Sequence, residues 1–263
     1  METLTISSKS YKLKDFSALF RGRVKIKLTN SSKIKIKRSR QRLNSRINKG
    51  DIIYGVNTGF GKLSDVQIKK TDQELLQLNL IRSHATGVGE PLGIGICRTI
   101  MVLKLLTYAK GYSGVSIDLV EKIIQLLNKD IVPYIPKKGS VGASGDLAPL
   151  AHLGLTLIGE GVSYYEGRKM RTKLALSKAK INPISLKAKE GISLINGTQV
   201  SSAIAISTLL NGENLLKTSD VIGAISVENS LSSREVFRSE VHQLKEHKGQ
   251  RDSARNIYRM LKG

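Results

Sequence analysis

Most of this 263-residue chain has the spacing of amphipathic helices. Apolar residues recur three or four positions apart from about residue 71 onwards, beginning with Leu75, Leu78 and Ile81. Thr71 and Glu74 stand in front of them with the spacing of a capping box, which indicates the start of a helix. Further helices are predicted over about 94–110, 116–129, 146–158 and 250–262, the last of them amphipathic.

A few short segments alternate instead, as half-exposed strands do. Residues 24–27 and 34–37 each alternate an aliphatic side chain with a lysine. We expect two strands there, followed by a helix over 38–48. Residues 164–168 (Tyr-Tyr-Glu-Gly-Arg) have the composition of a hairpin.

Small and aliphatic side chains dominate residues 197–227, which predicts a long buried helix. Gly212 and Gly223 lie inside it, and glycine weakens a helix, so we expect a kink or break near them. We place a domain boundary between an N-terminal region, residues 1–195, and a helical region, residues 196–263. The expected fold class is mainly α, with a small α/β N-terminal region.

The composition is that of a globular protein with an aliphatic core. Hydrophobic residues make up 40% of the chain and aromatic residues 5%, so aliphatic side chains must fill the interior. The single cysteine, Cys97, excludes an internal disulfide or a cysteine metal cluster and is interpreted as a buried structural thiol. The N-terminus lacks the apolar stretch of a signal peptide, and no apolar run reaches the ~18 residues of a membrane span. We therefore expect a cytoplasmic protein without a membrane partner.

Positive charge is the unusual feature of the composition. The formal net charge is +22, and the first 50 residues hold 15 basic and 2 acidic side chains. A solvated lysine-rich face explains this most simply, and an acidic protein partner is the next interpretation. A non-enzymatic protein that binds nucleic acid through residues 9–49 is the alternative from another functional class. This alternative predicts strongly salt-dependent binding. We regard nucleic acid as an unlikely partner, because this alternative leaves the two glycine-rich loops unexplained.

Residues 54–61 (Tyr-Gly-Val-Asn-Thr-Gly-Phe-Gly) form the first glycine-rich loop. A phosphate-binding Walker loop is excluded, because Phe60 replaces a required glycine and Leu63 follows Lys62 where Ser or Thr is needed. A tight surface turn is the plain interpretation. The functional one is that Tyr54, beside a glycine loop, transfers protons.

Residues 139–150 (GSVGASGDLAPL) form the second glycine-rich loop. A serine nucleophile elbow has the pattern G-x-S-x-G, and Asp146 occupies the position of its last glycine. Ser144 or Asp146 could instead cap the helix that follows. Capping alone does not explain why Ala143, Ser144 and Gly145 stand together.

The run GSVGASGDLAPLAHLGL resembles the signature of the aromatic amino-acid ammonia-lyases, and especially of the histidine ammonia-lyases. In that family the Ala-Ser-Gly tripeptide cyclises and dehydrates into 4-methylidene-imidazol-5-one, here from Ala143, Ser144 and Gly145. The residue types suit this chemistry. The amide nitrogen of Gly145 must reach the carbonyl carbon of Ala143, which requires small neighbours, and loss of the Ser144 hydroxyl leaves an electrophilic methylene.

Three further segments carry the same resemblance. Tyr54 falls on the catalytic tyrosine of the family's N-terminal loop, and Gly61 in that loop is assigned to substrate binding. His84, in the run NLIRSHATGVGEP, matches the helix end that selects the substrate. Asn196, in KEGISLINGTQ, matches the asparagine that contacts substrate and electrophile.

The resemblance implies an ammonia-lyase that acts on an aromatic amino acid, most simply L-histidine to urocanate. Tyr54 would remove the β-proton, while Asn196 would hold the substrate carboxylate or the oxygen of the electrophile. A histidine at position 84 suits a polar ring, imidazole first and phenol second. Tyrosine ammonia-lyase and aminomutase therefore remain alternatives. No external cofactor is expected, and no metal is assigned to His242 and His247.

Family members are much longer chains, and the matching part of this one ends inside their long helical region. The resemblance implies that the remaining half supplies a second tyrosine, a carboxylate-binding arginine and an acidic residue. It also implies a homo-oligomeric, tetramer-like assembly in which long helices form an intersubunit bundle. We expect one half of a split enzyme with a complementary C-terminal chain; a truncated chain or a degenerate relative are the alternatives.

Overall fold

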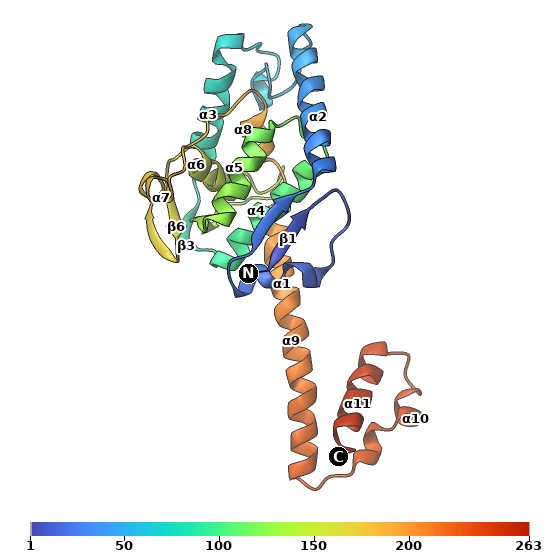
Figure 1. Cartoon of the computed structure of the whole chain (residues 1–263). Helices are drawn as coiled ribbons and strands as arrows, with labels where there is room; N and C mark the ends of the chain where they lie inside the picture. The colour runs from blue at the N-terminus through green and yellow to red at the C-terminus, as the bar shows by residue number, and fades with distance from the viewer. Residues whose placement is uncertain (1, 263) are drawn as a thin grey trace. The chain divides into compact units, whose positions relative to one another are not determined.

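The computed structural model describes residues 2–262, and helices dominate it (Figure 1). The chain forms two compact units, Met1–Ser207 and Thr208–Gly263. The mainly α class with a small α/β N-terminal region is confirmed. All predicted site residues lie in the first unit.

The chain begins with two short parallel strands and a basic helix. β1 (Thr3–Ile6) pairs with β2 (Lys25–Leu28), with the 3-10 helix η1 (Leu13–Phe16) and α1 (Ser17–Arg21) between them. The strand expected at residues 34–37 is wrong, since these residues belong to α2 (Asn30–Asn48). The hydroxyl of Thr29 accepts the backbone N–H of Ser32 and so caps this helix, which therefore begins before the alternating run.

Four helices surround the core of the first unit, and each matches a predicted segment. They are α3 (Gln73–His84), α4 (Ile94–Ala109), α5 (Ile117–Asn128) and α6 (Leu147–Leu157). The capping box expected at Thr71 and Glu74 is wrong. A short 3-10 helix, η3 (Lys70–Asp72), precedes α3, and the Thr71 hydroxyl donates to the side chain of Asp72 instead.

Short antiparallel strands connect these helices. β3 (Val88–Pro91) pairs with β5 (Pro136–Lys138). β6 (Val162–Tyr165) lies between β4 (Ile131–Pro133) and β7 (Arg168–Arg171), which confirms the predicted hairpin. α7 (Thr172–Ala179) follows and packs on β6 and β7.

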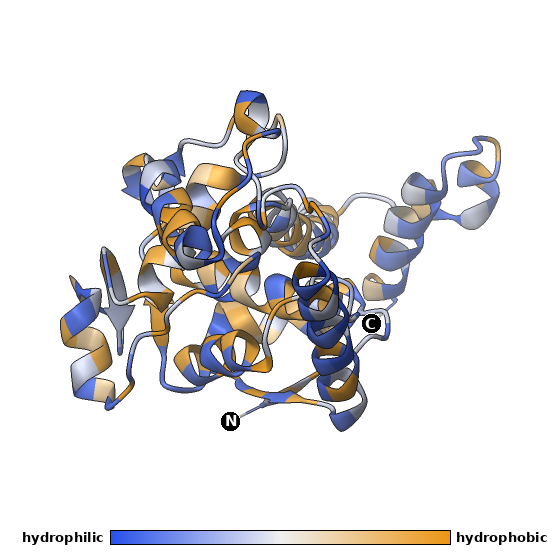
Figure 2. Ribbon diagram, turned by 90° about the horizontal axis from the view of Figure 1, so that it is seen from above, coloured by the Kyte–Doolittle hydropathy of each residue, from blue (hydrophilic) through white to orange (hydrophobic). Residues whose placement is uncertain are grey.

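Aliphatic side chains fill the interior of this unit, as the composition requires. Hydrophobic residues, coloured orange, recur along its helices (Figure 2). Cys97 is fully buried, and burial raises the pKa of its thiol to about 12, so it is an inert core residue. No helix among residues 2–262 is long and apolar enough to cross a bilayer.

The last helices follow a short α8 (Glu190–Ile195). α9 runs from Gln199 to Asn229 without interruption, so the expected break at Gly212 or Gly223 is wrong. The expectation that this helix is buried also fails: Leu209, Leu215 and Ile222 are each more than half exposed. Beyond it come η4 (Arg234–Phe237), α10 (Ser239–His242) and α11 (Lys248–Met260), which confirms the predicted C-terminal helix.

Gly191 in α8 and Gly212 in α9 allow the packing of α8 against α3 to be tested by substitution. A Cβ at Gly191 would lie 2.7 Å from the carbonyl oxygen of Gln77, whereas a Cβ at Gly212 meets no heavy atom within 4 Å. We expect Gly191→Ala to lower the free energy of unfolding by about 1–3 kcal/mol. Gly212→Ala should raise it by about 0.5–1 kcal/mol. Guanidinium unfolding of both variants checks this, and equal effects would contradict the close packing of α8 on α3.

Candidate active site

The loop that carries Tyr54 is held by its own side chains. The side-chain oxygen of Asn57 accepts the Ile53 N–H at 2.7 Å, and its amide group donates to the Asp51 carbonyl at 2.8 Å. Gly55 has φ +67°, and a Cβ there would lie 2.8 Å from the Phe60 ring. The glycine is thus required by both conformation and space.

The Tyr54 side chain stands at the surface of this loop, 57% exposed. Its ring meets Phe60 edge to face, with 6.1 Å between ring centroids. Its hydroxyl oxygen accepts the backbone N–H of Gly61 at 3.2 Å. This bond holds the phenol oxygen in place against the backbone of its own loop.

Gln77 joins the tyrosine loop to α8. This side chain is fully buried in α3, donates to the Gly55 carbonyl at 3.2 Å and accepts the Ile192 N–H at 3.1 Å. The role of Gln77 is not predictable from the sequence, because a glutamine inside an amphipathic helix gives no sign of which loops it will reach.

Tyr54 and Asn196 line one pocket of about 300 Å³, which also includes Ser193 from α8 and Lys189. Lys189 has φ +75°, a strained conformation for a residue with a side chain, and burial lowers the pKa of its amine. The structure therefore places the predicted base and the predicted substrate-contacting asparagine around the same space.

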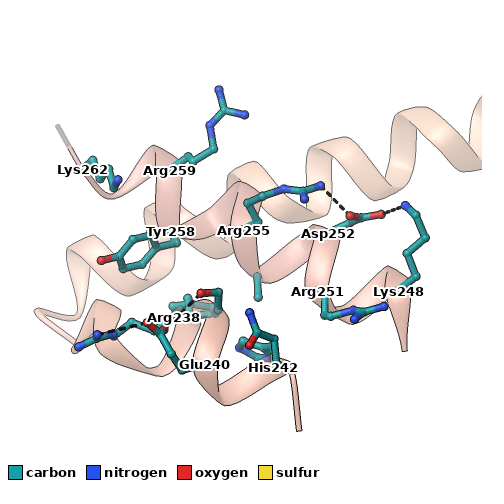
Figure 3. A pocket seen from close by; sticks show the side chains of 14 residues that line it. Arg238, Glu240, His242, Lys248, Arg251, Asp252, Arg255, Tyr258, Arg259 and Lys262 are labelled. Carbon is teal, nitrogen blue, oxygen red and sulfur yellow. Dashed lines mark hydrogen bonds and ion pairs between the residues drawn. The ribbon is translucent and has the colours of Figure 1, made fainter. Parts of the chain in front are cut away.

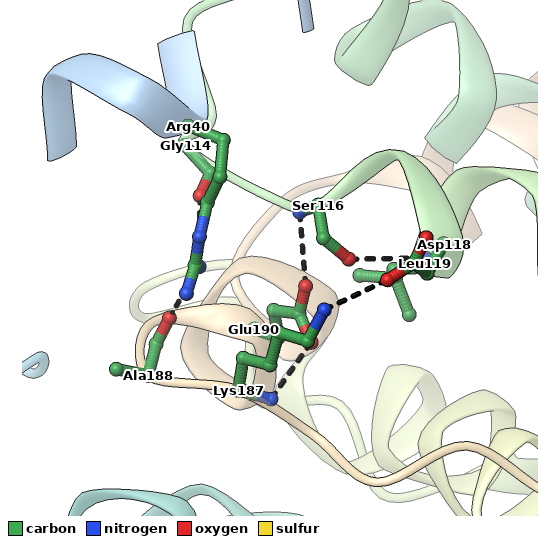
Figure 4. Close-up of polar contacts among 8 residues, drawn as sticks. All are labelled: Arg40, Gly114, Ser116, Asp118, Leu119, Lys187, Ala188 and Glu190. Carbon is green, nitrogen blue, oxygen red and sulfur yellow. Dashed lines mark hydrogen bonds and ion pairs between the residues drawn. The ribbon is translucent and has the colours of Figure 1, made fainter. Parts of the chain in front are cut away.

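A polar network fixes the start of α8 (Figure 4). The buried carboxylate of Glu190 accepts the backbone N–H groups of Ser116 and Lys187 at 2.9 and 2.8 Å. Arg40, from the basic helix α2, donates to the carbonyls of Gly114 and Ala188. Part of the N-terminal positive charge thus supports the site.

The Ala143-Ser144-Gly145 loop is pressed against the residue that follows Asn196. Gly145 has φ +106°, and a Cβ there would lie 2.5 Å from the carbonyl oxygen of Gly197. The next amide, that of Asp146, donates to the same carbonyl at 2.7 Å. Ala143 and Ser144 are exposed while Gly145 is buried. This close approach is possible only because residue 145 has no side chain.

The side chain of Asp146 secures this arrangement. Its carboxylate accepts the N–H groups of Val200 and Ser201 at 3.1 and 2.9 Å, and the hydroxyls of Ser140 and Ser201. It makes no capping bond to α6, so the proposed cap of the following helix is wrong for Asp146. The carboxylate instead binds the N-terminus of α9, where the helix dipole favours negative charge.

His84 is the last residue of α3, and the segment after it contacts the start of the glycine-rich loop 139–150. A Cβ at Gly139 would lie 3.0 Å from the Cα of Gly87. The Gly87 N–H donates to Nε2 of His152 at 3.2 Å, so His152 is a packed, hydrogen-bonded residue, and burial lowers its pKa. No hydrogen bond among the described residues joins His84 or Ser144 to Tyr54.

A larger pocket, about 610 Å³, lies in the second unit between η4, α10 and α11 (Figure 3). It contains none of the predicted site residues. Asp252 pairs there with Lys248 and Arg255, and Arg238 pairs with Glu240. The lining keeps a net positive charge, because Arg251, Arg259 and Lys262 also face it. Volume alone does not make it the active site. Among residues 2–262, no group of three His, Cys, Asp or Glu side chains is placed to hold a metal.

Lys104 is a second residue that sequence analysis missed. It lies in α4 with 1% of its surface exposed. Its Nζ donates to the carbonyls of Ser193 and Asn196 at 3.2 and 3.4 Å. Burial lowers the pKa of this amine to about 7, and the negative charge of Asp146 opposes the shift in part.

The lowered pKa of Lys104 predicts a dependence of stability on pH. Between pH 7 and pH 9 the unfolded chain holds this proton and the folded chain releases it, so folding becomes more favourable as pH rises. We expect the free energy of unfolding to rise by about 2 kcal/mol more in the natural chain than in Lys104→Met over this range. Guanidinium unfolding at both pH values checks this, and equal slopes would show that the amine titrates normally.

Comparison with known proteins gives the same family at the level of sequence and of structure. A family model for aromatic amino acid lyases matches residues 11–263. The histidine ammonia-lyase of Alkaliphilus oremlandii is 41% identical over 263 residues, which are 100% of this chain and 52% of that protein. The chain spans about half the length of the curated relatives it matches.

Two solved structures show how closely the fold agrees. Histidine ammonia-lyase from Trypanosoma cruzi has a TM-score of 0.90 and 32% identity, covering 98% of this chain and 50% of its own. Tyrosine aminomutase from Streptomyces globisporus has a TM-score of 0.93 and 32% identity, covering 99% of this chain and 49% of its own. With the loop geometry described above, these matches show that the chain belongs to the aromatic amino acid lyase family.

Proposed function

We propose that this chain is the N-terminal half of an ammonia-lyase that eliminates ammonia from an aromatic amino acid, with L-histidine as the first candidate. The contact of Gly145 with Gly197 is the observation that carries the proposal. It holds the Ala143-Ser144-Gly145 loop beside Asn196, which shares a pocket with Tyr54. Histidine ammonia-lyases among the relatives support the substrate.

The tripeptide is proposed to become 4-methylidene-imidazol-5-one, which would supply an electrophile for the substrate. For this the Gly145 nitrogen bonds to the Ala143 carbonyl carbon, and two waters leave, one with that carbonyl oxygen and one with the Ser144 hydroxyl. The exposed position of Ser144 leaves its methylene accessible to substrate. Gly197 and Asp146 hold the loop in the compact conformation that this closure requires.

Tyr54 is proposed as the general base. Its oxygen takes the β-proton of the substrate, and the Gly61 N–H holds that oxygen in place. Gly61 thus takes part in substrate binding in two ways: it positions Tyr54, and it forms part of the surface next to the substrate. Asn196 lies in the same pocket and offers an amide donor to the substrate carboxylate or to the oxygen of the electrophile.

His84 is proposed to select the substrate ring. Its Nδ1 lies 2.9 Å from the Leu80 carbonyl, which only accepts, so this nitrogen carries the proton. Nε2 is then an acceptor, and it has no hydrogen-bonding partner among residues 2–262. It suits an imidazole N–H or a phenol O–H of the substrate. Because a tyrosine aminomutase shares the fold closely, a tyrosine substrate and an amine shift to the β-carbon are the second candidate.

The complete enzyme is proposed to need further chains. A complementary C-terminal half, as a separate polypeptide in a homo-oligomeric assembly, would supply the groups that lie in the other half of the relatives. The exposed apolar side chains of α9 support such an assembly, since Leu215, Leu216 and Ile225 are each more than half exposed. The single buried thiol suits a cytoplasmic setting.

Intact mass with peptide mapping over residues 139–150 tests the electrophile in the complete enzyme. We expect a deficit of two waters in the natural protein and in Tyr54→Phe, because that change does not touch the tripeptide. Ser144→Ala should lose both the deficit and all ammonia release. Tyr54→Phe should lose turnover alone, by about 10²–10⁴-fold. Ammonia release by Ser144→Ala would overturn the proposed function.

Ammonia release from histidine, tyrosine and phenylalanine tests the role of His84. We expect histidine to be preferred, and His84→Leu to reduce its kcat/KM by about 10- to 200-fold, because the polar ring loses its acceptor. The kcat/KM for phenylalanine should fall far less. A natural preference for phenylalanine would contradict the assignment of His84.

A further inference from the structure

Lys104 is the most deeply buried cation of the first unit, and its surroundings are unusual for a lysine. It lies among the aliphatic residues of α4, and no carboxylate among residues 2–262 forms an ion pair with it. Burying an amine in this way is unfavourable unless its hydrogen atoms find acceptors. A residue of this kind needs an explanation beyond packing.

The acceptors of Lys104 are the last carbonyls of one helix. Its Nζ lies 3.2 Å from the oxygen of Ser193 and 3.4 Å from that of Asn196, at the C-terminal end of α8. A positive or donating group is favoured there, because carbonyls at a helix end have no partner within the helix and carry the negative end of its dipole.

Asn196, whose carbonyl Lys104 binds, lies next to the residue that contacts the Ala143-Ser144-Gly145 loop. Asn196 is followed by Gly197, whose carbonyl accepts the Asp146 N–H and touches Gly145. The Asn196 carbonyl thus lies one peptide unit before the carbonyl on which the Ala143-Ser144-Gly145 loop rests, and fixing the first restrains the second.

Tyr108, one turn after Lys104 on α4, provides an internal comparison. Its hydroxyl donates to the Ser193 carbonyl at 3.0 Å, and it is as deeply buried as the lysine. Ser193 thus has two donors from α4. Among the described residues, the Asn196 carbonyl has only Lys104.

We propose that Lys104 is a positioning residue that fixes the backbone of Asn196 and, through Gly197, the seat of the Ala143-Ser144-Gly145 loop. The inference rests on the proposed function for its effect on turnover, and on geometry alone for the anchoring. Either protonation state of the amine retains the hydrogens needed for both bonds.

The test compares Lys104→Met with Tyr108→Phe in the complete enzyme, this chain together with its C-terminal half. Both changes remove one buried polar group and keep the volume. Backbone hydrogen exchange over residues 193–198 measures the anchoring, and ammonia release measures kcat and KM. We expect Lys104→Met to speed exchange at residues 196–198 and to lower kcat by about 10- to 100-fold. Tyr108→Phe should change either quantity less than about threefold, because Ser193 keeps its second donor.

Results other than these also decide whether Lys104 anchors the backbone of Asn196. Unchanged exchange in folded Lys104→Met, or equal losses in both variants, would overturn the anchoring. If Lys104→Met does not fold, Lys104→Gln keeps one donor and should show the same changes to a smaller extent; natural exchange and turnover in it would overturn the proposal. If the natural enzyme releases no ammonia, the proposed function fails, and the exchange measurement still decides the anchoring.

Discussion

The buried carboxylate of Asp146 is the constraint on which the site depends. A carboxylate inside a protein needs several donors, and Asp146 finds them at the first turn of α9 and in the hydroxyls of Ser140 and Ser201. Its own backbone N–H binds Gly197. These bonds lock the end of the tripeptide loop to the start of α9, and the close approach of Gly145 to Gly197 follows from them. The proposed cyclisation would require a compact, preorganised loop of this kind.

The short helix α8 carries the second half of the site and owes its position to its neighbours. Six residues are too few for a helix that is stable alone. Gln77 binds its first turn from one side, while the Arg40 and Glu190 network holds the segment in front of it. Lys104 reaches its last carbonyls. Tyr54 and Asn196, far apart in the sequence, line one pocket because the loop of the first and the helix of the second share these supports.

The helix α9 shows a different balance of forces. It continues through Gly212 and Gly223, since a glycine weakens a long helix by only about 1 kcal/mol and leaves its hydrogen bonds intact. Its aliphatic composition predicted burial, yet Leu209, Leu215 and Leu216 are exposed in the chain as described. The composition of α9 indicates that its apolar surface favours an apolar neighbour. It does not report which chain supplies that neighbour.

The hydrophobic pattern was sufficient to predict most helices, and the composition of residues 164–168 to predict the hairpin, because both are local properties of the chain. The hydrophobic pattern failed at residues 34–37, where four alternating residues are too few to outweigh the helix that Thr29 caps. Motif resemblance singled out Tyr54, Asn196 and the tripeptide as candidates, since the proposed chemistry requires particular residue types. Lys104 and Gln77 stayed hidden, because each reads as an ordinary polar position of a helix. Their importance comes from contacts with carbonyls and amides of distant segments, and only the tertiary structure decides which backbone groups a buried side chain meets.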